Sequence, residues 1–402
     1  MTSIGIRYDP HLSSSSGINQ TAIWLAELFS TLGHQLFLVH TTETEKTALF
    51  PLISLYHVQK LDLLLDIDGQ FSSELRQKAS RTIVFLRTFL QFAELDSVVY
   101  LETPYSNRSF KGVHEIWCWD VLNPKETLPS IQTLFPCPIR TVPFIWSPTL
   151  IQEESKGAIA SFCEGSWTVH VSEKNKENTS SCVFPLVAVR ELSKKNVIHA
   201  TYLFHHMDRV KENRFLKENV LQNIESDTLP ITFAPNGSFV EWIQEPNSIL
   251  FSHSRFTPLR IGLLNALWLG LPVVHNSPVL RTLHPLLSNL FYTGNNVREI
   301  SAAFSWIQSH SAEWHAALPS LRQAMLEMFS KKEEWACLLK GVLDAAGVEG
   351  ALAVLKKMAR ERKKNIFLIS HRDELIGRVN NVLKVIKENG YTSYANDLEV
   401  NE

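Results

Sequence analysis

The chain has 402 residues, which is enough for two to three domains. Its 45% hydrophobic and 20% charged residues are typical of a folded globular protein and exclude a disordered or fibrous chain. Lysine and arginine (39) nearly balance aspartate and glutamate (41), which argues against a protein drawn as a whole to nucleic acid or to an anionic membrane.

The first forty residues predict a strand, a helix and a second strand. SIGIRY (3–8) is short, apolar and rich in β-branched residues, as buried strands are. Residues 18–33 place apolar side chains mostly on one helical face and end at Gly33. Residues 34–40 form the next strand. Because such crossovers are right-handed, the two strands are expected to be parallel.

The same alternation continues to about residue 146. Strands are expected at 61–67, 81–86, 97–101, 114–119 and 139–146, and helices at 71–79 and about 125–135. This order predicts an open parallel sheet with helices on both faces. A polar stretch at 147–165 marks the boundary, so residues 1–155 form the first expected domain.

A second alternating series follows in residues 156–340. Strands are expected at 166–171, 181–189, 229–234, 248–252, 271–276 and 287–293, and helices at 196–207, 237–245, 258–269, 297–309 and 312–340. The predicted fold class is therefore α/β, with two Rossmann-like parallel-sheet domains.

The last sixty residues predict a small α+β appendage at 343–402. A basic amphipathic helix (343–364), a strand (365–370) and a short helix (371–379) come first. Residues 381–397 then alternate apolar and polar side chains about Asn389-Gly390, a strong hairpin signal.

Ligands of open parallel sheets bind at the carboxyl ends of the strands, and the loop after the first strand offers suitable groups there. Asp9 and His11 are candidate general bases, while Ser16, Gly17 and Asn19 form a loop at a helix N-terminus that can attract an oxygen-rich group. The alternative is a flexible loop with a helix cap, because the stretch has no G-x-G-x-x-G and no Walker A lysine.

The segment 249–280 predicts a second site. One strand delivers His253, Ser254 and Arg255 into its loop, and the next delivers His275, Asn276 and Ser277. Arg255 and Arg260 can bind a diphosphate because a guanidinium contacts its oxygens in pairs. Asn265, on the helix between the two strands, is a candidate ligand for a ribose hydroxyl. We expect these groups to converge on one groove.

Further candidates have structural alternatives of equal or greater weight. Arg190, Lys194 and Lys195 follow the expected strand 181–189 and can bind phosphate or form a solvated turn. His114 and Asp120 are additional base candidates. The D-x-D of Asp66 and Asp68 and the pair His205-His206 are more consistent with structural roles than with a metal site, so no metal ligand is expected. Trp117, Trp119 and Trp146 can stack on a sugar, although core packing is more frequent in apolar strands.

Residues 263–276, LLNALWLGLPVVHN, resemble the nucleotide-sugar half of glycosyltransferases with the two-Rossmann GT-B architecture. The corresponding family run reads roughly E-G-F-G-L-P-x-L-E-A-M-A-x-G-x-P-V-V. The phrase is more narrowly similar to an uncharacterised bacterial and viral branch with "ALYLGYPLVHNS". Residues 15–39, SSGINQTAIWLAELFSTLGHQLFLV, are similar to the acceptor half, and together the resemblance spans residues 1–340.

The resemblance implies a transferase that moves a sugar from a nucleotide-sugar donor (UDP- or GDP-sugar) to an acceptor that is a glycan, a protein or a modified base. It implies two domains that face a cleft and no obligatory metal. The two glutamates of the family, which hold the transferred sugar and the ribose, fall on Thr257 and Asn265. Their absence supports an alternative, a non-catalytic binding or scaffold protein on the same fold.

Residues 343–400 resemble the C-terminal end of phage-type recombination ATPases of the SMC-like family, with His371 at the position of the switch histidine. The chain has no P-loop, signature motif or Walker B carboxylate pair, so we expect a tail without an ATP site. A DNA-associated factor is a third reading, disfavoured by the near-neutral charge.

The N-terminal residues show no secretion signal, and the apolar run 261–275 is too short for a bilayer span. The five cysteines are odd in number and widely spaced, which argues against a disulfide framework and favours a reducing compartment. These features predict a cytoplasmic protein without membrane partners and with nucleic acid as an unlikely partner.

Overall fold

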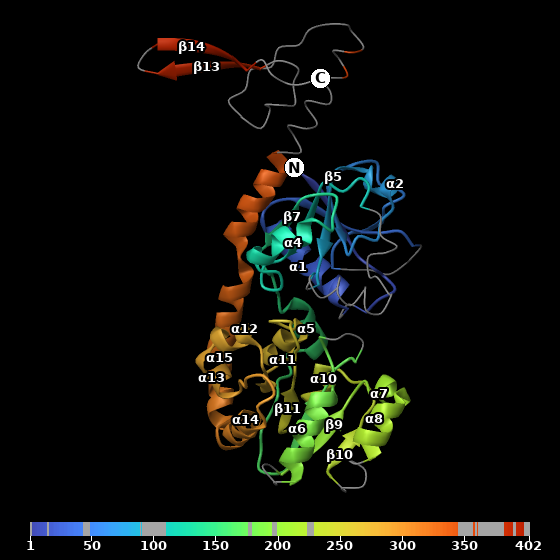
Figure 1. Ribbon diagram of the computed structural model, residues 1–402, viewed down its shortest axis with the longest axis vertical. Helices are drawn as coiled ribbons and strands as arrows, with labels where there is room; N and C mark the ends of the chain where they lie inside the picture. Colours follow the sequence, from blue (N-terminus) through green and yellow to red (C-terminus); the bar gives the residue numbers. More distant parts are fainter. Residues whose placement is uncertain are drawn as a thin grey trace. The chain divides into compact units, whose positions relative to one another are not determined.

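The computed structural model describes most of the chain (Figure 1). The described residues are 2–13, 16–42, 49–88, 90, 110–175, 179–194, 199–222, 229–344, 357, 360, 382–388 and 391–397. The chain divides into a large unit, Met1–Ala346, and a small one, Gly347–Glu402. The strand expected at 97–101 and the elements expected at 365–379 lie outside the described residues.

The first half of the large unit is built on a seven-stranded parallel sheet in the order β3-β2-β1-β4-β5-β6-β7. Its strands are β1 Ser3–Arg7, β2 Gln35–His40, β3 Leu52–Ser54, β4 Leu61–Ile67, β5 Ala79–Leu86, β6 Glu115–Trp119 and β7 Ile139–Val142. Its helices are α1 Gly17–Thr31, α2 Ser73–Arg76, η1 Lys125–Thr127 and α4 Leu128–Gln132. The predicted strands before residue 90 are confirmed to within two residues at each end.

Both faces of this sheet are covered, as the apolar runs of its strands predict. One face packs against α1, whose buried side chains include Ile23, Trp24 and Phe29. On the other face, Ile116 and Cys118 of β6 pack against Ile131 of α4. Side chains of successive strand residues therefore enter different cores, which holds the sheet in one register.

The second half is built on a five-stranded parallel sheet in the order β10-β9-β8-β11-β12. Its strands are β8 Trp167–Val171, β9 Ala200–Phe204, β10 Ile231–Phe233, β11 Ser248–Phe251 and β12 Val273–Val274. In both sheets the chain first builds outward in one direction and then returns to the other side of its first strand. The reversal lies between β1 and β4 in the first sheet and between β8 and β11 in the second.

Helices connect the strands of the second half and continue beyond them. They are α5 Thr149–Ser155, α6 Val183–Lys194, α7 Asp208–Glu212, α8 Arg214–Leu216, η2 Lys217–Leu221, α10 Phe239–Trp242, α11 Gly262–Trp268, α12 Pro278–Leu283, α13 Pro285–Asn289, α14 Val297–Ser309 and α15 Ser311–Ser330. Residues 332–344 are also helical. The predicted helix 297–309 is confirmed at both ends.

Two neighbouring elements were predicted with their types exchanged. Residues 181–189 were expected to be a strand but lie mostly in α6, and 196–207 were expected to be a helix but contain β9. An apolar run of this length does not distinguish the two by hydrophobicity. Burial does: in α6 the buried residues recur at helical spacing, whereas β9 alternates between buried and less buried positions. The strand expected at 287–293 is also wrong, since it overlaps α13 and keeps only a bridge between Phe291 and His275.

The helical residues 332–344 return to the first half, on the face of its sheet that α1 covers. The Trp335 ring lies 5.6 Å from Phe29 and 5.7 Å from Trp117, and its indole N–H donates to the Pro143 carbonyl at 3.1 Å. The end of the predicted second domain therefore packs with the first.

In the small unit, β13 Val382–Glu388 and β14 Tyr391–Asp397 form an antiparallel pair with Glu388 opposite Tyr391. The predicted hairpin is thus confirmed, although its turn residues lie outside the described part. Across the residues described, no helix combines the length and the apolar character needed to cross a bilayer.

Candidate functional site

The reversal point of the five-stranded sheet brings together the loop after β8 and the loop after β11. Because β8 and β11 are adjacent and parallel, both loops leave the same edge in opposite directions. Ligands of doubly wound sheets bind at such a point. The loops 172–182 and 252–261 therefore lie where this kind of sheet binds its ligand.

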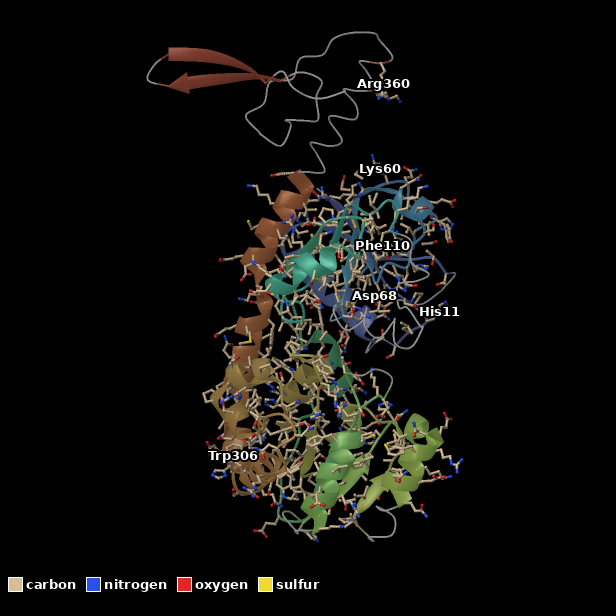
Figure 2. The ribbon with its side chains drawn as sticks, in the orientation of Figure 1. His11, Lys60, Asp68, Phe110, Trp306 and Arg360 are labelled. Atoms are coloured by element: carbon tan, nitrogen blue, oxygen red, sulfur yellow. The ribbon has the colours of Figure 1, made fainter. Side chains whose placement is uncertain are left out.

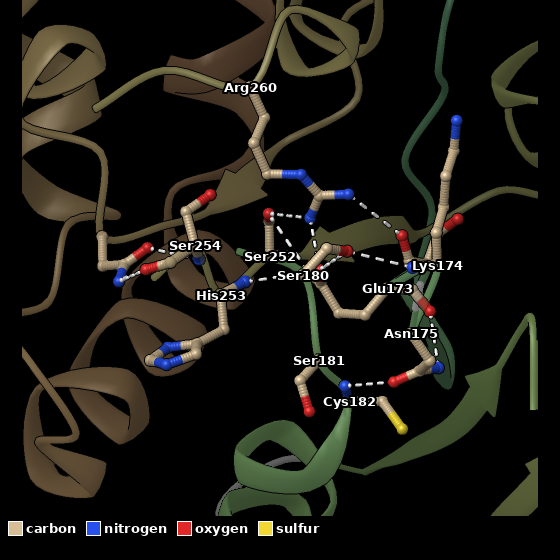
Figure 3. A network of polar contacts seen from close by, with 12 residues as sticks. Glu173, Lys174, Asn175, Ser180, Ser181, Cys182, Ser252, His253, Ser254 and Arg260 are labelled. Carbon is tan, nitrogen blue, oxygen red and sulfur yellow. Dashed lines mark hydrogen bonds and ion pairs between the residues drawn. The ribbon is translucent and has the colours of Figure 1, made fainter. Parts of the chain in front are cut away.

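A buried carboxylate, Glu173, joins these two loops (Figure 3). Its Oε1 accepts from the His253 N–H at 3.0 Å and from the Ser252 hydroxyl at 3.4 Å. Its Oε2 accepts from the Ser180 hydroxyl at 2.8 Å and from the Arg260 guanidinium at 2.5 Å. Glu173 is 0% exposed. Burying a carboxylate is costly unless it is paired and hydrogen-bonded, and here both oxygens are.

Asn175 extends the network to the neighbouring loops. Its Oδ1 accepts from the Cys182 N–H at 2.8 Å, just before α6, and its Nδ2 donates to the His206 carbonyl at 3.1 Å, just after β9. The Asn236 side chain in turn accepts from the His206 N–H at 2.8 Å. The loops after β8, β9 and β10 are thereby fixed relative to one another.

Cationic side chains accompany the Glu173 network. The Arg260 guanidinium donates to Glu173 and, at 3.2 Å, to Ser252, while its side chain keeps 22% exposure. Lys174 and Arg255 are exposed on the same two loops. One guanidinium of fixed orientation and two exposed cations can bind an anion with several oxygens, such as a diphosphate.

Two predicted site residues, His253 and Asn276, support the loops from within. His253 is buried, with Nδ1 2.9 Å from the Tyr292 hydroxyl. Burial, with Arg255 and Arg260 adding to it, holds the pKa of His253 down to about 4. The Asn276 amide bonds both the N–H and the carbonyl of Ser254, at 2.9 and 2.7 Å. Ser254 itself bridges to Ser180.

His275, a predicted donor ligand, is 0% exposed, so its side chain lies in the interior. Burial lowers the pKa of His275 to about 4, so the imidazole is neutral near pH 7. Ser277, beside it, is also buried. Its hydroxyl caps α12 by accepting from the Leu280 N–H and donates to the Pro258 carbonyl at 2.5 Å.

Asn265 also lies in the interior, at 6% exposure. Its Oδ1 accepts from the Trp146 indole N–H at 2.9 Å, and the Trp146 ring lies 5.5 Å from Trp268. The expected contact with a ribose is replaced by a contact between the segment that follows β7 and helix α11. The loops after β11 and β12 meet as expected, through contacts of Ser254 with Asn276 and of Pro258 with Ser277. Asn265 and His275 were expected at the same groove, but both side chains are buried.

The predicted phosphate ligands Arg190 and Lys194 were placed in a loop after a strand, and this placement is wrong. Both lie in the last two turns of α6. Because α6 starts at the loop that follows β8, its last turns lie away from the carboxyl edge of the sheet. Lys195 lies outside the described residues.

In the first half, Asn19 organises the loop after β1 rather than facing a ligand. Its side-chain amide donates to the carbonyls of Asp9 at 2.9 Å and Ser13 at 3.1 Å, and its Oδ1 accepts from the Asp9 N–H. Ser16 caps α1 by accepting from the Asn19 N–H. These contacts agree with the alternative interpretation of this stretch, a loop with a helix cap.

Gly17 makes room for an arginine. A Cβ at this position would lie 2.6 Å from Nη1 of Arg87, which follows β5. The other edge of the Arg87 guanidinium binds Asp68 at 2.6 and 3.2 Å. Asp68 has a positive φ of 60° directly after β4. Figure 2 shows Asp68 and His11 at the same end of this half, away from Lys60, which precedes β4.

The candidate bases lie in two loops, one after β1 and one after β6. Asp9 follows β1, where its Oδ1 accepts from the His11 N–H and its Oδ2 lies 3.8 Å from Arg7. His11 is exposed. Asp120 follows β6 and accepts from the N–H groups of Val121 and Phe144, while partial burial raises its pKa.

The remaining candidates have structural roles. His114 precedes β6 and therefore lies at the opposite edge from the loops just described; its Nδ1 accepts from the Thr82 N–H. Asp66 is fully buried against Arg76 at 2.8 Å. Among the described residues, no group of His, Cys, Asp or Glu has the arrangement of a metal site.

Sequence reasoning missed Glu173, although a signal was present. A charged residue two positions after a buried strand, as Glu173 is after β8, is a candidate for the carboxyl edge of a sheet. The mistaken strand at 181–189 directed attention to Arg190 and Lys194 instead of to this loop.

Comparison with known families gives one match along most of the chain. The family described as "Protein of unknown function (DUF2827)" matches residues 2–337. The chain belongs to this family. No curated protein matches it significantly.

Solved structures show the fold. An O-GlcNAc transferase of Thermobaculum terrenum has a TM-score of 0.52 at 12% identity and covers 86% of this chain and 68% of its own. The DNA modifying enzyme beta-glucosyltransferase also reaches 0.52, at 9% identity, over 86% of this chain and 100% of its own. OtsA reaches 0.51 at 11% identity, over 85% and 99%. The family member described here has the GT-B fold of glycosyltransferases.

Proposed function

We propose that this protein is a glycosyltransferase that binds a nucleotide-sugar donor at the carboxyl edge of its five-stranded sheet. The observation that carries the proposal is the position of the Glu173–Arg260 pair at the reversal point of that sheet, in a chain with the GT-B fold. One structural neighbour, the DNA modifying enzyme beta-glucosyltransferase, has uridine diphosphoglucose as its substrate, which makes a UDP-sugar the first donor to test.

Arg260 and Arg255 would bind the diphosphate of the donor. Glu173 fixes the orientation of Arg260 before any ligand arrives, so little conformational entropy is lost on binding. Arg255 on the same loop supplies a second, exposed cation. Two guanidinium groups can stabilise the leaving diphosphate electrostatically, and we propose that the reaction has no obligatory metal.

The acceptor would lie at the carboxyl edge of the seven-stranded sheet. Inverting transfer needs a group that removes the proton of the acceptor hydroxyl. Asp9, His11 and Asp120 stay candidates for it. The raised pKa of Asp120 is in the direction that favours a base working near neutral pH. The acceptor class, whether glycan, protein or modified base, stays open.

The test is isothermal titration of the full chain with UDP, GDP and ADP, with and without EDTA. Arg255→Ala and Arg260→Ala should each weaken binding about tenfold or more, the usual effect of losing a charge-assisted contact. Arg298→Ala, on α14, serves as the matched control and should bind normally. The proposal is wrong if no nucleoside diphosphate binds, or if binding is unchanged in both loop variants.

A second candidate, a non-catalytic binding protein on the same fold, is favoured by one observation. The GT-B glycosyltransferases that the sequence resembles have two glutamates where this chain has Thr257 and Asn265. Asn265 is moreover hydrogen-bonded to Trp146. Hydrolysis of a bound nucleotide sugar without acceptor distinguishes the two. A transferase releases some free sugar, whereas a binding protein releases none.

A further inference from the structure

The loop between β11 and α11 holds Phe256 in a conformation that is unusual for an aromatic residue. Its φ is +66°, in the left-handed region, and the residue is 61% exposed. The Thr257 N–H donates to the Arg255 carbonyl at 2.7 Å, which closes a three-residue turn centred on Phe256. Turns of this kind with a positive φ are rare and strained. Backbone strain and an exposed ring thus coincide at one residue.

Other positive φ angles in the described chain occur where they are tolerated. Some belong to residue types that adopt this region more readily than most, and two belong to lysines that end helices. These residues are Asp68, Asn175, His206, Asn247, Lys156 and Lys331. Among the non-glycine residues described with a positive φ, Phe256 is the one aromatic residue.

Contacts on both sides fix the strained turn. Before it, Asn276 bonds both backbone groups of Ser254, and the Arg255 N–H donates to the Thr179 carbonyl at 3.2 Å. After it, the Pro258 carbonyl accepts from Ser277. Strain that the surroundings impose in this way is typical of ligand sites. The turn therefore fixes the backbone of Phe256, a residue that is largely exposed.

We propose that Phe256 is the platform on which the nucleobase of the donor stacks. This inference rests on the proposed function. Arg255 is the adjacent residue and Arg260 lies on the same loop, so one loop carries both the ring and the cations that would bind the diphosphate. Bases stack on aromatic side chains through their π-faces, whatever their hydrogen-bonding edges. The platform therefore selects for a planar base without selecting which base.

The experiment compares ligands and variants in the full chain by isothermal titration. The ligands are UDP, UDP-glucose and inorganic pyrophosphate, which lacks the base. Phe256→Leu keeps an apolar side chain without an aromatic face, and Phe256→Tyr keeps the ring. Phe215→Leu changes another exposed aromatic residue, on α8, and is the matched control.

We expect Phe256→Leu to weaken UDP binding about tenfold, in the range reported for loss of a base stack. Pyrophosphate binding should stay unchanged, and the Tyr variant and the Phe215 control should bind UDP as the native chain does. Phe256→Gly should lose the same affinity but melt at a higher temperature, because glycine adopts the positive φ without strain. A residue kept only for folding would instead lower the melting temperature when removed.

Several results would overturn the inference. If Phe256→Leu binds UDP normally, the ring contacts no base, while the donor site itself still stands. If the loss appears with UDP-glucose and not with UDP, the ring contacts the sugar. If pyrophosphate binding falls equally, the variant has disturbed the loop. If the native chain binds no nucleoside diphosphate at all, the proposed function fails together with the inference.

Discussion

The ion pair between Glu173 and Arg260 gives the sharpest prediction about the site. Arg260→Met removes the counter-charge of a carboxylate that is 0% exposed, leaving it with the donors of Ser180, Ser252 and His253. Breaking a buried pair from one side costs about 3–5 kcal/mol. Because the Arg260 side chain keeps 22% exposure, water can reach the pair, and we expect about 2–3 kcal/mol.

Glu173→Gln should be destabilising for a different reason. Both carboxylate oxygens accept hydrogen bonds, and each faces donors only. A glutamine offers one acceptor and one donor, so in either orientation its NH2 group meets another donor. The unsatisfied groups cost about 1–3 kcal/mol. In the double variant, Glu173→Gln with Arg260→Met, no guanidinium remains to oppose the amide. The double variant should therefore lose about 1–3 kcal/mol less unfolding free energy than the two single variants lose together.

The assay is urea unfolding followed by tryptophan fluorescence, with the slope m compared among variants so that only changes at constant m are read as stability. The exposed pair Arg214–Glu218, four residues apart on one helical stretch, is the matched control. The corresponding substitutions there should have almost no effect, as for other surface pairs. Costs at Glu173 and Arg260 as small as those of the control, or a double variant that shows simple additivity, would refute the reasoning.

Two further predictions concern stability. Gly17→Ala should displace Arg87, whose Nη1 lies 2.6 Å from the new Cβ, and lower the melting temperature. Gly341→Ala is the control, because this helical position has nothing within 4 Å of the new Cβ. It should raise the unfolding free energy by about 0.5–1 kcal/mol and with it the melting temperature. Acid should destabilise the second half, because burial lowers the pKa of His170 to about 3 and of His275 to about 4. Their neutral forms contribute fully above the unfolded pKa of about 6.5, and each pH unit below it costs up to about 1.4 kcal/mol per histidine until the folded pKa is reached. Urea unfolding between pH 7 and 4.5 measures this, and His170→Phe should flatten the dependence.

Either prediction has a clear contrary outcome. If Gly17→Ala melts like the native chain, Arg87 moves at no cost and its contact with Asp68 does not depend on the glycine. If unfolding free energy is constant or rises as the pH falls from 6.5 to 4.5, the buried histidines are not held neutral in the folded protein.

The α/β class, the two parallel sheets and the place of most strands could be predicted from the order of residues alone. Strand β5 and helix α14 can be predicted from the local sequence. Burial on two faces gives an apolar run, as in residues 83–86 of β5, and burial on one face gives a helical repeat, as in α14. The exchange of α6 and β9 shows the limit of this signal, because a short apolar run fits either element until its partners are known.

Which polar residues point outward at the strand ends could not be predicted in this way. His275 and Asn265 looked like ligands because they are polar and sit near strand ends, yet their side chains enter the interior, one at 0% exposure and the other bonded to Trp146. Glu173 and Arg260 are 87 positions apart and meet because β8 and β11 are adjacent and parallel. The local sequence sets the strands, but strand order and the direction of each side chain depend on packing between distant segments, and these fix the site.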